Sequence, residues 1–155
     1  MPLAYHLAVS VVFGIVLGLF LSNCVLSRAY VVGDSMIPTY EDGDTLWVCK
    51  VLTPSRGDRV VVKADSLNKD IIKRVVALPG ETIQIIEGRV YINDEYYPEE
   101  YINNHDLNYS SGLASEPITL GENEYFVMGD NRVISRDSRE IGPVNRDDVI
   151  GVVIS

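Results

Sequence analysis

A stretch of 20 residues without a charged side chain, Leu7 to Leu26, is the feature that most limits how this chain can fold. A helix that crosses a bilayer needs about 20 consecutive apolar residues, which is this length. A cleaved signal peptide, a lipoprotein signal ending at Cys24 and a buried core helix are the alternatives. The run is long for a signal peptide, and no basic region precedes it. Asn23 is large and polar where a lipoprotein signal has a small residue. A buried core helix would carry a polar face, which this run lacks. We therefore expect a retained membrane anchor over residues 1–28.

Residues 29–155 have the length of one ordinary domain with a core of its own. The net charge is −9, with 22 acidic against 13 basic residues, so the basic patch of a nucleic-acid-binding protein is missing and we expect no nucleic-acid partner. Cys24 lies in the apolar run and Cys49 in a strand-like run, an arrangement that disfavours a disulfide. With only two dispersed histidines besides, the sequence predicts no metal and no cofactor.

Beyond residue 30 the sequence consists of short apolar runs separated by Gly, Pro, Asp and Asn, which is typical of a mainly β domain. Glu87-Gly88-Arg89 separates two such runs as a tight hairpin would. The polar segment Pro98 to Asn123 is expected to be an excursion, ordered in part by Tyr101 and Tyr109, and not a second domain. We predict an antiparallel β-barrel or folded sheet. The expected strands are Thr45 to Cys49, Arg59 to Lys63, Ile71 to Leu78, Thr82 to Ile86, Val90 to Ile92, Tyr125 to Met128 and Val149 to Ile154.

Ser35 and Lys73 are candidates for a nucleophile and its base. The chain has only two histidines, His6 at the start of the apolar run and His105 in a polar segment, so a Ser-His-Asp triad is poorly supported and a Ser-Lys pair is favoured. The ordinary alternative for Ser35 is a Gly-Asp-Ser turn, stiffened by Pro38.

Lys73 would lie on one face of its strand with Ile71 and Val75, because side chains alternate along a strand. Aliphatic neighbours desolvate an ammonium and lower its pKa, and a general base needs a drop from ~10.4 to roughly 7–8. The alternative is a lysine that reaches water from a sheet edge.

A third polar segment, Gly129 to Arg139, directly follows an apolar run and is dense in hydrogen-bonding side chains. A solvated loop or a calcium-binding loop are the alternatives. Its arginines would compete with a calcium ion, which makes the calcium site a poor interpretation.

Four segments, in this order, resemble the bacterial type I signal peptidases, which are membrane-bound Ser-Lys proteases. The similarity extends from the apolar run almost to Ser155 and is specific because the whole ordered set is present. The segments are Gly33 to Thr39 (GDSMIPT), Arg56 to Val61 (RGDRVV), Lys73 to Gly80 (KRVVALPG) and Gly129 to Arg139 (GDNRVISRDSR).

The resemblance implies a role for each matching residue. Ser35 would be the nucleophile, Lys73 the general base and Ser135 a hydroxyl that orients the lysine amine. Asp137 and Arg139 would form a supporting charged pair, and Met36 would lie beside the substrate pocket. Two positions depart from the family pattern: some relatives have an oxyanion-hole serine where this chain has Gly33, and many have Asp where it has Val133.

The resemblance also implies a fold, a substrate and a location. The fold would be a signal-peptidase/LexA-like antiparallel β-barrel domain, residues 29–155, behind one transmembrane helix. The substrates would be secretory preproteins with small residues at positions −1 and −3. The catalytic domain would lie on the extracytoplasmic side of the cytoplasmic membrane, although Arg28 after the apolar run weakly favours the cytoplasm by the charge rule.

Two other functions would fit part of this sequence. Self-cleaving repressors of the LexA type share the Ser-Lys chemistry, but they carry a DNA-binding domain where this chain has the apolar run. An inactive anchored module that holds precursors without cutting them is disfavoured by the presence of both Ser35 and Lys73.

Overall fold

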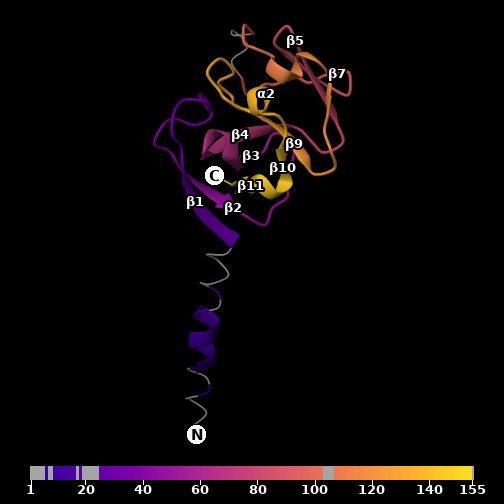
Figure 1. Ribbon diagram of the computed structural model, residues 1–155. Coiled ribbons are helices and arrows are strands. Elements are labelled where there is room, and N and C mark those ends of the chain that lie inside the picture. The colour runs from indigo at the N-terminus through magenta and orange to yellow at the C-terminus, as the bar shows by residue number, and fades with distance from the viewer. Residues whose placement is uncertain (1–5, 7–8, 17, 19–24, 103–106, 155) are drawn as a thin grey trace.

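The computed structural model describes residues 6, 9–16, 18, 25–102 and 107–154. These residues form two antiparallel sheets with short helical segments between their strands (Figure 1). The larger sheet has the order β1-β2-β11-β3-β4-β9-β10 and the smaller one β7-β6-β5-β8. The strands are β1 (Leu26–Tyr30), β2 (Thr45–Cys49), β3 (Arg59–Ala64), β4 (Lys69–Ala77), β5 (Thr82–Ile86), β6 (Arg89–Ile92), β7 (Glu95–Tyr96), β8 (Ile118–Thr119), β9 (Glu124–Met128), β10 (Val144–Asn145) and β11 (Val149–Val153).

The helical segments are short. They are η1 (Asp65–Leu67), η2 (Gly112–Ser115), α2 (Ser138–Ile141) and η3 (Arg146–Asp148). The prediction of a mainly β, antiparallel domain is confirmed. The prediction of a barrel is wrong, because within the described residues β1 and β10 are the two outer strands of an open sheet and do not pair with each other.

The seven strands expected from the apolar runs are all present, with bounds that agree within two residues. The hairpin between β5 and β6 turns through Glu87 and Gly88, which both have positive φ as a tight two-residue turn requires. β1 was not expected. It begins at Leu26 and pairs along its whole length with β2, so a strand occupies residues that the sequence assigned to the end of the anchor.

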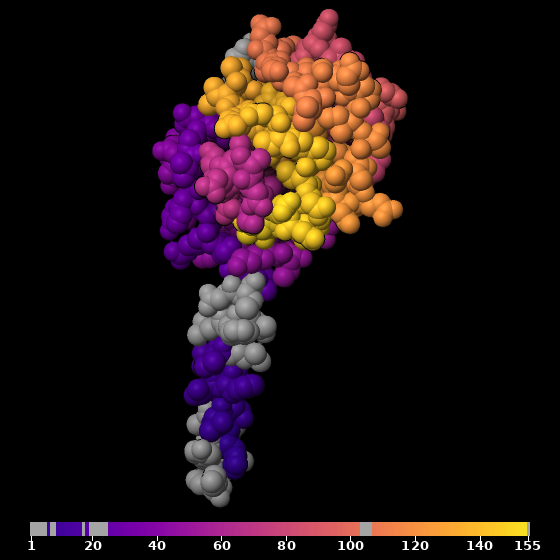
Figure 2. Space-filling view, in the orientation of Figure 1, coloured from indigo at the N-terminus to yellow at the C-terminus, as the bar shows by residue number. Residues whose placement is uncertain are grey.

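The helical residues 9–16 lie apart from the two sheets in Figures 1 and 2. Residues 9–16 are helical, and their large apolar side chains, such as Val12 and Phe13, are exposed. No helix in the described part of the chain is both long and apolar enough to span a bilayer. Much of the range 1–28 lies outside the described residues, so the anchor and the division at residue 28 stay predictions.

Strand β4 lies where three clusters of buried apolar side chains meet. Val75 belongs to one cluster, Val76 to the second, and Ile72 packs against the third. Burial on both faces of a central strand fixes its register, because a shift by one residue would exchange the two faces. The strand is therefore a rigid support for Lys73 and Arg74.

Strand β4 has strand partners on both edges only at Arg74. β3 pairs with it from Lys69 to Arg74, whereas β9 pairs only with the part from Arg74 to Ala77. Among the described residues the segment Lys69 to Lys73 thus has no strand on its β9 side. β1 is likewise an outer strand.

Candidate active site

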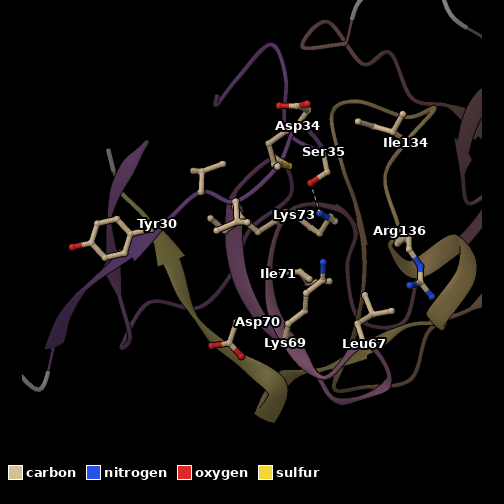
Figure 3. A pocket seen from close by; sticks show the side chains of 15 residues that line it. Tyr30, Asp34, Ser35, Leu67, Lys69, Asp70, Ile71, Lys73, Ile134 and Arg136 are labelled. Atoms are coloured by element: carbon tan, nitrogen blue, oxygen red, sulfur yellow. Dashed lines mark hydrogen bonds between the residues drawn. The ribbon is translucent and has the colours of Figure 1, made fainter. Parts of the chain in front are cut away.

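Ser35 and Lys73, 38 positions apart in the sequence, meet at the unpaired edge of β4. The Lys73 Nζ lies 2.7 Å from the Ser35 Oγ and 2.8 Å from the Ile72 carbonyl oxygen (Figure 3). The Lys73 side chain is only 3% exposed, and this burial is the largest cause of the fall in its pKa from 10.5 to about 8. Burial disfavours the charged amine, so a substantial fraction of Lys73 is neutral near pH 8. The arrangement can transfer a proton from the serine hydroxyl to the lysine amine.

The loop that carries Ser35 is fixed from two sides. Its turn is closed by hydrogen bonds from the backbone N–H groups of Thr39 and Tyr40 to the Met36 carbonyl, and the Met36 side chain is 1% exposed. On the other side the Asn131 N–H donates to the Ser35 carbonyl over 3.0 Å, and the Asn131 amide donates to the Asp34 carbonyl. The nucleophile candidate is therefore held by the segment that follows β9.

Gly33 has φ +82°, a conformation that side chains with a Cβ rarely adopt. Its N–H donates to the Asp42 carboxylate over 2.6 Å. The Gly33 N–H is thus occupied, whereas the Ser35 N–H has no hydrogen-bond acceptor in the described part of the chain.

Asp137 and Arg139 form a buried ion pair next to the site, with the Arg139 Nε 2.8 Å from the Asp137 Oδ1. Burial alone would raise the pKa of Asp137, but the Arg139 guanidinium and the Gly129 N–H more than offset it and hold this pKa below its usual value. The carboxylate therefore stays charged across the neutral range. A charged pair at these positions agrees with the sequence expectation, and its role stays a prediction.

Ser135 packs directly on Gly129. A Cβ added to Gly129 would lie 2.2 Å from the Ser135 Oγ and 2.6 Å from the Ser35 carbonyl oxygen, so this close approach requires glycine. The buried Ser135 Oγ has no hydrogen-bond partner among the described residues, the Lys73 amine included. Its role in orienting the amine stays a prediction.

A second buried ion pair, which sequence reasoning did not identify, lies behind the site. Arg74 donates to both oxygens of Asp130, over 2.8 and 2.6 Å, and the Thr39 hydroxyl bonds to both side chains. Arg74 follows Lys73 on β4, so its side chain leaves the opposite face of the strand. The signal that could have found the pair is an arginine at an inward position of a buried strand, since such a charge requires a partner.

A third buried pair joins Arg132 to Glu99 in the polar excursion, and Tyr109 also accepts a hydrogen bond from Arg132. Tyr101 covers Arg74, with the guanidinium carbon 4.1 Å from the ring centre, and donates to Glu99. Both tyrosines therefore order the excursion as expected, by packing it against the arginines behind the site.

Two cavities of about 280 Å³ each follow the unpaired edge of β4. The first contains Ser35 and Lys73, and the second continues along β1; the two share Tyr30, Asp70 and Ile72. Figure 3 shows Tyr30 on one side of Ser35 and Ile134 on the other. An extended chain laid against this edge would pass the Ser35 hydroxyl.

Comparisons with known proteins agree on one family. The family model described as "Signal peptidase, peptidase S26" matches residues 4–155. The chain is 32% identical to a signal peptidase I from Streptococcus pneumoniae serotype 4, over 86% of this chain and 85% of that protein, and 38% identical to one from Leptolyngbya laminosa, over 88% and 71%. A crystal structure of a signal peptidase I from Enterococcus faecalis V583 has a TM-score of 0.58 and 29% identity, and covers 67% of this chain and 99% of its own.

Proposed function

Because the chain belongs to the signal peptidase family, peptidase S26, and is therefore a serine endopeptidase, we propose that it removes signal peptides from exported preproteins with Ser35 and Lys73 as a catalytic dyad. The observation that carries the proposal is the 2.7 Å contact between the Lys73 amine and the Ser35 hydroxyl. Burial lowers the pKa of that amine to about 8, and a lysine acts as a base only in its neutral form.

In the proposed reaction, neutral Lys73 accepts the Ser35 proton while the Ser35 oxygen attacks the carbonyl at the cleavage site. The Ser35 N–H, which has no acceptor in the described residues, is a suitable donor to the oxyanion that develops. The Lys73 ammonium then protonates the leaving amine. The neutral lysine that results activates the water that hydrolyses the acyl-enzyme.

The substrate would bind as an extended strand along the unpaired edge from Lys69 to Lys73. This edge offers backbone groups without a strand partner among the described residues, which favours addition of a peptide strand. Alternate side chains of the peptide would enter the cavity beside Met36, and the others would face away. Such alternation accounts for the small residues at −1 and −3 that the family resemblance implies.

A membrane location completes the proposal. The helical residues 9–16 expose apolar side chains that a lipid environment would cover, and they precede the domain in the chain. We expect a single anchor, with the catalytic domain at the extracytoplasmic face of the cytoplasmic membrane, where preproteins arrive.

The test is cleavage of a synthetic signal-peptide substrate by the full chain in detergent, with products identified by mass spectrometry. Ser35→Ala and Lys73→Ala are compared with Ser55→Ala and Lys63→Ala, matched substitutions on the surface outside the cavity. We expect cutting after a small residue that the first two variants abolish and the last two retain. Full cleavage by Ser35→Ala would refute the dyad, and a folded wild type that binds but never cuts would favour the binding module.

A further inference from the structure

Lys69, the first residue of β4, carries an ammonium that lines the same cavity as Lys73. The two lysines are four positions apart on one strand, so their side chains leave the same face. Figure 3 shows the Lys69 side chain directed along the strand toward Lys73, whereas the Asp70 carboxylate is directed away. Lys69 is exposed to the cavity solvent and Lys73 is buried beneath it.

The other charges near Lys73 are compensated in pairs. Of the two carboxylates that act on it, Asp137 is bound by Arg139 and Asp130 by Arg74. Each of these pairs is buried. Asp137 and Asp130 still raise the pKa of Lys73, Asp137 more strongly than Lys69 lowers it, and the Arg139 charge opposes them only in part.

Among the other charged side chains that line the cavity, some have an ion-pair partner and some do not. Arg136, the other cation of the cavity, bonds to Glu140. Asp34 lies next to Ser35 and faces solvent. Within the described residues Lys69 forms no ion pair, which leaves it as the uncompensated cation on the strand of Lys73.

We propose that Lys69 is a positioning residue for the reaction, which acts through Lys73 by repelling a proton from its amine across the cavity. The proposal rests on the proposed function, because it assigns Lys69 a role only if Lys73 is the general base. Consistent with it, burial contributes most to the low pKa of Lys73, and the Lys69 charge acts in the same direction. The consequence is a larger neutral fraction of the base near neutral pH.

The size of the effect follows from distance and solvent. Four residues of extended strand separate the two Cα atoms by roughly 13 Å. Two like charges about 10 Å apart, in surroundings between protein and water in polarity, shift a pKa by about 0.3–1 unit. Below the pKa the rate falls in proportion to the neutral fraction, so loss of the Lys69 charge would slow the enzyme roughly two- to tenfold there.

The test is the pH dependence of kcat/KM for a peptide substrate without acidic residues, which removes direct pairing between Lys69 and the substrate. For Lys69→Gln we expect the midpoint of the rise of kcat/KM with pH, which is the acidic limb of the profile, to lie about 0.3–1 pH unit higher than in the wild type. At high pH the two rates should converge. Lys69→Glu should move it further, and Lys69→Arg should leave it in place. Lys63→Gln, on the neighbouring strand β3 with its ammonium 3.1 Å from Asp65, is the matched control and should not shift the limb.

Ionic strength gives a second readout, because at 1 M salt the screening length falls to about 3 Å and the difference between Lys69→Gln and the wild type should largely disappear. A Lys69→Gln profile that superimposes on the wild type, or a rate loss equal at every pH, would overturn the proposal. These outcomes are distinct from failure of the dyad, which would appear as cleavage by Ser35→Ala.

Discussion

Arg74 and Asp130 connect the strand that carries the candidate base to the loop that holds the candidate nucleophile. Arg74 directly follows Lys73 on β4, and Asp130 directly precedes Asn131, whose N–H binds the Ser35 carbonyl. The two side chains form two hydrogen bonds with each other, and both are buried. Because a close charged pair tolerates little displacement, it fixes the distance between Ser35 and Lys73.

Replacement of Asp130 by Ala should therefore lower both stability and activity. It leaves the Arg74 charge buried without its carboxylate, which typically costs about 3–5 kcal/mol of unfolding free energy. Urea unfolding measures this loss, and kcat for a signal-peptide substrate should fall more than KM changes, since the variant misplaces Ser35 relative to Lys73. Asp65→Asn removes a carboxylate from the exposed Lys63–Asp65 pair and should change neither quantity noticeably. An Asp130→Ala variant as stable and active as Asp65→Asn would refute the role of the pair.

The bounds of a strand could be predicted from the sequence where they depend only on the residues of that strand and its flanking turns. β2 and β5 have the predicted bounds, because β-branched runs between turn residues define a strand without reference to the rest of the chain. β1 could not be separated from the apolar run before it, since the hydropathy of Leu26 continues that run. The sequence also could not distinguish an open sheet from a closed one, because both show the same alternation along each strand.

The candidate site was predictable to a similar degree. Ser35 and Lys73 lie together, as their segments suggested, and the lysine is buried by the aliphatic neighbours seen in its strand pattern. The pair of Arg74 with Asp130 spans 56 positions and that of Arg132 with Glu99 spans 33, and such pairing depends on how strands and loops are arranged in space. Whether the Ser135 hydroxyl bonds to the Lys73 amine likewise depends on side-chain geometry that no motif specifies.

The activity of the wild-type enzyme should rise with pH through about 8. Burial lowers the pKa of Lys73 to this value, and only the neutral amine can accept the Ser35 proton, so kcat/KM should fall roughly tenfold per pH unit below it. Initial rates from pH 6 to 9.5 at constant ionic strength measure this rise in kcat/KM. A profile that is flat over this range would exclude Lys73 as the titrating base.

Replacement of Gly129 by Ala should disturb the site without removing any polar group. The new Cβ would lie 2.2 Å from the Ser135 Oγ and 2.6 Å from the Ser35 carbonyl oxygen, so the two serine segments must move apart. We expect a loss of about 1–3 kcal/mol in unfolding free energy and a larger relative loss of kcat, because the Ser35 loop is displaced.

Gly121→Ala is the matched control for this substitution, since its Cβ would meet only the flexible end of Glu124, at 3.3 Å. Equal activity of the two alanine variants would show that the close approach at Gly129 is not needed for catalysis.

Replacement of Lys73 by Met should stabilise the folded protein at neutral pH while abolishing cleavage. The pKa of Lys73 is 10.5 when solvated and about 8 in the folded protein, so between these values the unfolded chain binds more protons than the folded one. Wild-type stability therefore rises with pH across this window, and at pH 7 the buried amine costs about 3 kcal/mol that methionine avoids. Urea unfolding at pH 7 and pH 9.5 should show a gain for Lys73→Met that shrinks at the higher pH, whereas Lys63→Met, at an exposed position, should show no such change. A Lys73→Met gain that is absent at pH 7, or that grows with pH, would mean that the amine is not held in its neutral form by burial.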